Sequence, residues 1–110
     1  MSKYIIFGTY TAETLAAVRN DGYVTRVEIN RRLSESLGGV LECMYFMTAS
    51  EWDFFAIGEL SSEALFAIVS GGNATGAFQR VQAREIRTAE EADEITTSGF
   101  EWVAPGQGTQ

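Results

Sequence analysis

Residues 40–60, VLECMYFMTASEWDFFAIGEL, carry the clearest signal of the fold. Two runs rich in β-branched and aromatic residues, Val40 to Thr48 and Trp52 to Leu60, are joined by the short segment 49–51, which predicts an antiparallel hairpin. Successive residues of a strand point to opposite faces, so one face of the first run is expected to carry Leu41, Cys43, Tyr45 and Met47. Neither face of the hairpin is cleanly polar. Since one layer of helices covers only one face, the sheet is expected to need a partner on the other.

The segments before the hairpin predict a strand and a helical region. Lys3 to Tyr10 is an almost unbroken apolar and aromatic run, which indicates a central strand covered on both faces. Thr11 can cap the helical region that follows, and residues 20–22 interrupt it. The second part carries apolar residues four positions apart: Ile29, Leu33 and Leu37. Because this spacing places them on one helix face, we expect them to pack on the sheet.

The segments after the hairpin predict a second helix and a last strand. Ser61 can cap the helix, and residues 71–72, both glycine, are expected to end it. Residues 78–87 alternate apolar and polar side chains and indicate an edge strand. Thr88 and Glu91 form a capping-box pattern, which predicts a further short helix.

The order β-α-β-β-α-β predicts an α+β domain of the ferredoxin-like fold, with an antiparallel sheet in the order 4-1-3-2 and both helices on one face. The uncovered face is most simply buried by a second copy of the chain, since burial of apolar surface stabilises an interface. We therefore expect a homo-oligomer, a dimer or higher, built as a dimeric α/β barrel.

Length and charge limit the function. The chain has 110 residues, which predicts one domain over residues 1–104 and a flexible tail over residues 105–110. The net charge of −7 argues against nucleic acid as a partner, because a phosphate backbone would be repelled. The apolar run near the start is too short for a signal peptide or a membrane span, so we expect a cytoplasmic protein without a membrane partner.

The scarcity of metal-ligating and nucleophilic residues limits the chemistry further. The chain has no histidine and one cysteine, Cys43, so we expect no metal site and no cofactor. The apolar surroundings of Cys43 on its strand favour a buried packing role over a reactive thiol.

Several short motifs give the chain a resemblance to a known family. They are Lys3-Tyr4-Ile5-Ile6, Thr9-Tyr10-Thr11, Leu37-Gly38-Gly39, Leu41-Glu42-Cys43-Met44-Tyr45-Phe46, Ala74-Thr75-Gly76-Ala77 and Thr88-Ala89-Glu90-Glu91-Ala92. With these motifs the chain resembles the GYD-domain family, small bacterial proteins with this α+β fold and no established biochemical role. The Gly-Tyr-Asp tripeptide of the family corresponds to Glu51-Trp52-Asp53, in which Asp53 matches and Trp52 keeps an aromatic ring.

Five residues are candidates for a binding site: Tyr45, Trp52, Asp53, Arg80 and Arg84. The aromatic rings would form the wall of a pocket for a small organic ligand, and the arginines would hold an anionic group. Asp53 is the one candidate for acid/base catalysis. Structural roles are open for all of them: Asp53 in shaping the turn, Trp52 in packing, and the arginines as solvated edge charges.

Three classes of function remain open at this point. The first is an oligomeric small-molecule-binding or regulatory module. The alternative is a cofactor-independent enzyme of the dimeric-barrel type, a monooxygenase or isomerase, with Asp53 as acid/base. A structural assembly module is the third. A cavity with converging polar groups would favour the first two classes, and a fully packed interface would favour the third.

Overall fold

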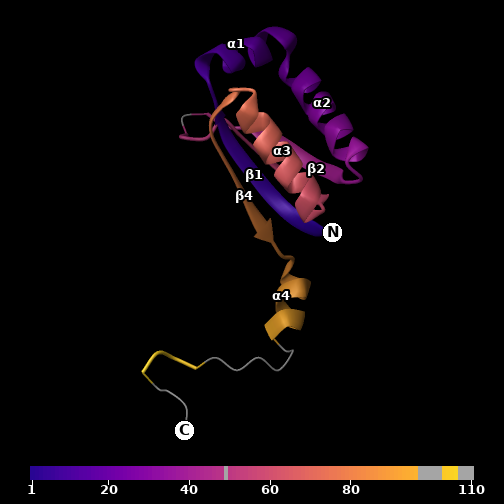
Figure 1. The fold of residues 1–110 in the computed structure, drawn as a ribbon, viewed down its shortest axis with the longest axis vertical. Coiled ribbons are helices and arrows are strands. Elements are labelled where there is room, and N and C mark those ends of the chain that lie inside the picture. The colour runs from indigo at the N-terminus through magenta and orange to yellow at the C-terminus, as the bar shows by residue number, and fades with distance from the viewer. Residues whose placement is uncertain (49, 97–102, 107–110) are drawn as a thin grey trace.

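The structure is a computed structural model that describes residues 1–48, 50–96 and 103–106. In chain order the described elements are β1 (Ser2–Tyr10), α1 (Ala12–Asp21), α2 (Tyr23–Ser36), β2 (Val40–Phe46), β3 (Phe54–Leu60), α3 (Ser62–Ala74), β4 (Phe78–Ile86) and α4 (Ala89–Thr96). The four strands form one antiparallel sheet in the order β2-β3-β1-β4 (Figure 1). This confirms the α+β fold and the predicted strand order, counted from the opposite edge. The sheet of the single chain is open, with β2 and β4 at its edges.

The helices α2 and α3 lie on the same face of the sheet, over different strands (Figure 1). α2 contacts β2, and α3 contacts β4 and β3. The predicted first helical region is two helices, because the chain turns at Gly22, whose φ of 101° favours glycine. α4 lies beyond the end of β4, away from the other helices (Figure 1).

The core is small and aromatic. Tyr10, Val18 and Phe54 are buried together. The ring of Tyr10 stacks on Phe54, with centroids 5.1 Å apart, and on Phe78, with centroids 5.5 Å apart. These contacts join β1, β3, β4 and α1 at one end of the helix-covered face.

The opposite face of the sheet, which we call the open face, has no helix over it in the described part of the chain. Cross-strand pairing brings Tyr45, Phe55 and Phe7 into one row and Cys43, Ile57 and Ile5 into the next. Its centre is apolar, as the sequence predicts. Most of these side chains are only half-buried within the chain.

Two local predictions are wrong. Leu41 does not share a face with Cys43 and Tyr45, because a register shift between Leu41 and Cys43 turns Leu41 toward the helices. The second helix does not end at residues 71–72 but continues to Ala74. Glycine lowers the stability of a helix, yet it can still adopt the helical conformation.

The C-terminal prediction is confirmed only for its first part. The backbone N–H of Glu91 donates to Thr88 Oγ1 at 3.1 Å, and that of Thr88 donates to Glu91 Oε1 at 2.8 Å, which is the predicted capping box. The Thr88 backbone hydrogen bond lowers the pKa of the Glu91 carboxyl. The expected tail of residues 105–110 lies outside the described residues from 107 onward.

Asp53 joins three strands at the end of the sheet. Its carbonyl accepts from the Met47 N–H at 2.8 Å, and its own N–H donates to the Gly8 carbonyl at 2.8 Å. Its carboxylate oxygen Oδ2 accepts from the Tyr10 N–H at 2.8 Å. The backbone pairing of β1 with β3 ends just before this point. The Asp53 side chain supplies the hydrogen-bond acceptor that a further backbone pair would have provided.

Replacement of Asp53 should destabilise the fold. Asp53→Ala leaves the half-buried Tyr10 N–H without its acceptor, which costs about 1–3 kcal/mol of unfolding free energy. Asp53→Asn keeps an acceptor oxygen and should lose less. Chemical denaturation monitored by circular dichroism measures both. A loss below about 0.5 kcal/mol for Asp53→Ala would contradict the structural role, since that is the range of neutral surface changes.

Two glycine substitutions should have opposite effects. A Cβ at Gly58 would lie 2.5 Å from the Val40 carbonyl oxygen, so Gly58→Ala should cost about 1–3 kcal/mol through overpacking. A Cβ at Gly71 meets nothing within 4 Å, so Gly71→Ala inside α3 should stabilise by about 0.5–1 kcal/mol. Thermal unfolding of the pair tests this. A stabilised Gly58→Ala variant would refute the close approach of β2 and β3.

Candidate functional site

Tyr45, Trp52 and Arg80 lie on the open face. Tyr45 is 59% exposed and stacks on Phe55, with ring centroids 5.4 Å apart. Trp52 packs edge-on against Phe7 at 4.7 Å, and the Arg80 guanidinium lies 4.6 Å from the centre of the Trp52 ring. Arg80 also forms an ion pair with Glu51 at 3.7 Å. The arginine is thus held over the indole by a cation–π contact and a nearby carboxylate.

Arg84 shares this face, because its cross-strand partner on β1 is Ile5. Its guanidinium donates to Gln82 Oε1 at 3.2 Å, and its side chain is exposed. Tyr45 is on the edge strand β2 and the arginines are on the opposite edge strand β4, which places them about 14 Å apart at the usual strand spacing. The two arginines and Tyr45 therefore border a broad apolar face.

Asp53 is directed elsewhere. Its carboxylate accepts from the Tyr10 backbone N–H at 2.8 Å, at the boundary between the two faces. The structure thus brings four of the five predicted residues onto the open face and engages the carboxylate of the fifth with the backbone of β1.

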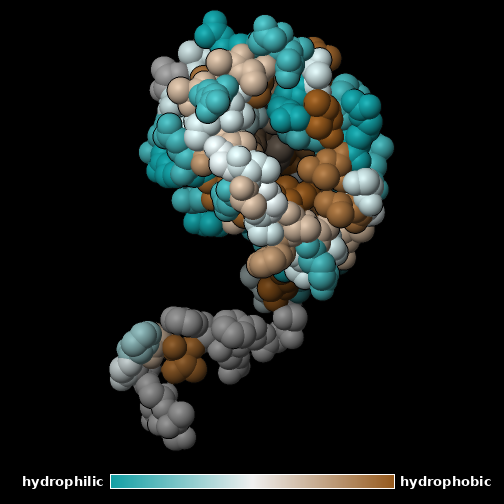
Figure 2. Space-filling view, turned by 45° about the horizontal axis from the view of Figure 1, so that its top comes forward, coloured by the Kyte–Doolittle hydropathy of each residue, from teal (hydrophilic) through white to brown (hydrophobic). Residues whose placement is uncertain are grey.

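A separate cavity lies on the helix-covered face, between α2, α3 and the sheet. We call it the interhelical cavity, and its volume is about 500 Å³. The space-filling view shows a hollow in this face, bordered along one side by hydrophobic side chains (Figure 2). Most of the lining is apolar: Ile6, Ile29, Leu33, Leu37, Leu41, Phe54, Ala56, Leu60, Ala67, Ile68, Val69, Ala77, Phe78 and Val81. Such a volume and lining are typical of a site for a small organic molecule.

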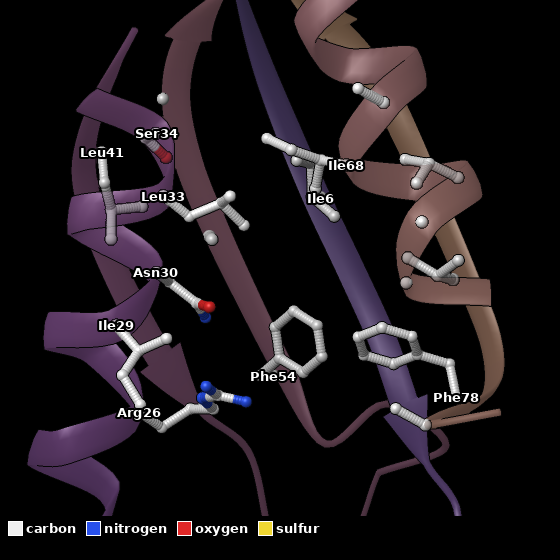
Figure 3. Close-up of a pocket in the computed structure, with 18 of the residues that line it drawn as sticks. Ile6, Arg26, Ile29, Asn30, Leu33, Ser34, Leu41, Phe54, Ile68 and Phe78 are labelled. Carbon is white, nitrogen blue, oxygen red and sulfur yellow. The ribbon is translucent and has the colours of Figure 1, made fainter. Parts of the chain in front are cut away.

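One row of polar side chains from α2 enters the cavity. Arg26, Asn30 and Ser34 are four residues apart and point from the helix toward the cavity (Figure 3). Asn30 Nδ2 donates to the Met44 sulfur at 3.2 Å. Nε of Arg26 is shielded from solvent and has no hydrogen-bond partner among the described residues.

The electrostatics of the cavity are set by Arg26 and Tyr10. Arg26 is the one charged side chain among the described residues that line it. Burial raises the pKa of the Tyr10 hydroxyl to about 12, an effect that the nearby Arg26 opposes. Tyr10 therefore stays neutral at physiological pH, and the cavity carries one positive charge within an apolar wall.

Sequence reasoning missed this cavity. Ile29, Leu33 and Leu37 were expected to pack on the sheet, yet they are 39%, 43% and 38% exposed and line the cavity instead. The signal available in the sequence was the second row on the same helix, Arg26, Asn30 and Ser34. Polar residues at the helical repeat beside an apolar stripe indicate a wall that faces a polar group or solvent.

Two features are absent from the described residues. In that part of the chain, no three side chains of the metal-ligating types gather closely enough to hold a metal ion. No described helix is both long and apolar enough to cross a bilayer.

Comparison with known proteins gives one family. No curated protein matches the chain. A family model described as the GYD domain matches residues 4–96, which include all four strands except the start of β1 and every helix of the described chain. The match covers most of the 110 residues. Together with the predicted and observed strand order, it shows that this chain belongs to the GYD domain family.

Proposed function

We propose that this GYD domain protein is a small-molecule-binding module whose ligand occupies the interhelical cavity. The observation that carries the proposal is the cavity itself, about 500 Å³ of apolar-lined space within a domain of 110 residues. Protein interiors are normally close-packed, and an open apolar space forfeits the contacts that its walls would otherwise make. A bound organic molecule would restore those contacts.

The exposed apolar wall supports the same function. Ile29, Leu33 and Leu37 each keep more than a third of their surface accessible along the cavity. A ligand that covers this stripe removes apolar surface from water, which contributes about 25 cal/mol for each Å². The half-exposed stripe therefore favours binding from outside through the gap between α2 and α3.

We propose a second copy of the chain as the partner of the open face. Ile5, Phe7, Phe55 and Ile57 form its apolar centre, and the described chain places no helix over them. Contiguous exposed apolar surface of this kind marks an interaction site, and a two-fold dimer uses the same patch on both subunits. The proposed dimer leaves the interhelical cavity of each subunit facing outward. We place this module in the cytoplasm, where a lone half-buried thiol such as Cys43 stays reduced.

The alternative is a cofactor-independent enzyme, a monooxygenase or isomerase, that works on the open face. Arg80 over Trp52 is the observation in its favour, because a fixed cation beside an aromatic wall suits an anionic aromatic substrate. In such an enzyme Tyr45 and Arg84 would border the substrate, and Asp53 would have to leave the Tyr10 N–H to act as acid/base. Binding in the interhelical cavity requires no such rearrangement and is the function we favour.

Filling the mouth of the cavity should weaken binding. Ala67 on α3 lines the cavity and is exposed, so Ala67→Phe would place a ring in the space for the ligand. We expect N-phenylnaphthylamine, a neutral apolar fluorophore, to bind the wild-type protein saturably and the variant at least about tenfold more weakly, the loss that about 1.4 kcal/mol produces. Fluorescence titration measures both affinities.

Ala16→Phe is the matched control, because Ala16 is exposed on α1 and does not line the cavity. It should bind as the wild type does. Equal binding by Ala67→Phe, or no saturable binding by the wild-type protein, would reject the cavity as the site.

The proposed dimer predicts a mass in solution of at least twice 12.1 kDa. Sedimentation velocity at micromolar concentration should show this mass for the wild-type protein and a monomer for Ile57→Lys, since a charge at the centre of an apolar interface is not compensated. Val24→Lys is the control, because Val24 is 78% exposed on α2. A wild-type monomer throughout that range would exclude the dimer.

A further inference from the structure

We propose that the ligand of the interhelical cavity is an amphipathic monocarboxylate, whose carboxylate binds Arg26 and whose hydrocarbon body lies along the apolar wall. This inference rests on the proposed function, binding in that cavity, and adds the chemical class of the ligand. Three observations support this inference. Arg26 has no counter-ion among the described residues, the cavity carries a single positive charge, and the lining side chains follow a definite order along the cavity.

Arg26 lacks a counter-ion within the described residues. Three arginines form ion pairs with surface carboxylates: Arg31 with Glu28, Arg80 with Glu51 and Arg87 with Glu85. Arg19, Arg32 and Arg84 form none among the described residues, but their side chains are exposed to water, whereas Arg26 is half-buried. The chain has 15 acidic and 8 basic residues, so acidic partners are abundant. Arg26 points into an apolar cavity (Figure 3), and its Nε is shielded from water and has no acceptor among the described residues.

An unsatisfied guanidinium N–H in an apolar wall is costly, and a carboxylate is the group that satisfies it best. The planar guanidinium presents its donors as a fork that matches the two oxygens of a carboxylate. A single charge is indicated, because Arg26 is the one cation among the described lining residues and the net charge of the chain is −7. A dianion such as a phosphate monoester would carry a second charge into the apolar wall without a partner.

The body of the ligand follows from the side chains beyond Arg26. Phe54 and Phe78 lie near the Arg26 end of the cavity, and Ile6, Leu41 and Ile68 lie toward the other end (Figure 3). From Arg26 to Ser34 the helix rises about 12 Å, at 1.5 Å for each residue. A hydrocarbon chain of medium length fits this distance. Tyr10, whose pKa burial raises to about 12, stays neutral and adds no negative charge at the Arg26 end.

Calorimetric titration with three probes of equal chain length tests the proposal: decanoate, decanol and decylamine. We expect the wild-type protein to bind decanoate about tenfold to hundredfold more tightly than decanol, the range of a charge-assisted hydrogen bond. Decylamine should bind most weakly, because its ammonium faces Arg26. Arg26→Gln should lose the preference for decanoate while its affinity for decanol stays within about threefold.

Arg32→Gln is the matched control. It removes the same charge from the same helix at an exposed position outside the cavity, and it should keep the wild-type preference. Arg26→Lys keeps the charge but loses the fork, and it should retain only part of the preference. A circular dichroism spectrum establishes that each variant is folded, and the wild-type comparison of the three probes decides the question without any variant.

The outcomes separate the two proposals. Equal binding of decanoate and decanol by the wild-type protein, or a preference for decanoate that survives in Arg26→Gln, would overturn the monocarboxylate and leave binding in the cavity standing. Failure of every probe to bind would overturn both.

Discussion

The hydrogen bond from the Tyr10 N–H to the Asp53 carboxylate fixes the end of the sheet on which both candidate surfaces depend. Asp53 lies between two aromatic neighbours that point to opposite sides of the sheet. Residues two apart on a regular strand share a face, but Trp52 precedes β3, which begins at Phe54, and so does not follow that alternation. Trp52 contacts Phe7 on the open face, and Phe54 stacks on Tyr10 in the floor of the interhelical cavity. A single carboxylate therefore sets the position of one ring on each face. This gives Asp53 a structural role within the GYD domain of this chain.

The cavity exists because small residues meet where the helices separate. α2 lies over β2 and α3 over β4, and Ala56 and Gly58 of β3 lie in the floor between them. On the other wall, α3 contributes Ala67, Gly71 and Gly72. Side chains of this size cannot fill the space that large residues fill in an ordinary core. The same space would close if α2 moved toward α3, but the contacts of α2 with β2 and α1 hold it at the edge of the sheet.

The sequence predicted the architecture because its main signals are local. Apolar alternation located the strands, and the capping residues Thr11, Ser61 and Thr88 located the starts of three helices. The register shift after Leu41 was not predictable, because a bulge depends on the pairing of two strands and the apolar pattern fits either face. For the site, spacing along β4 correctly put Arg80 and Arg84 on one face. The cavity required the separation of α2 from α3, a tertiary distance that no periodicity encodes.

Successive residues of β3 alternate between the two faces of the sheet. Phe54, Ala56, Gly58 and Leu60 line the interhelical cavity, whereas Phe55, Ile57 and Glu59 belong to the open face. Adjacent residues of β3 therefore belong to different surfaces. Under the proposed function, homologues can diversify what they bind by changing even-numbered positions while their subunit contacts stay intact, and they can diverge in assembly through the odd-numbered ones. On this proposal, a strand of seven residues would let two traits of this small domain evolve separately.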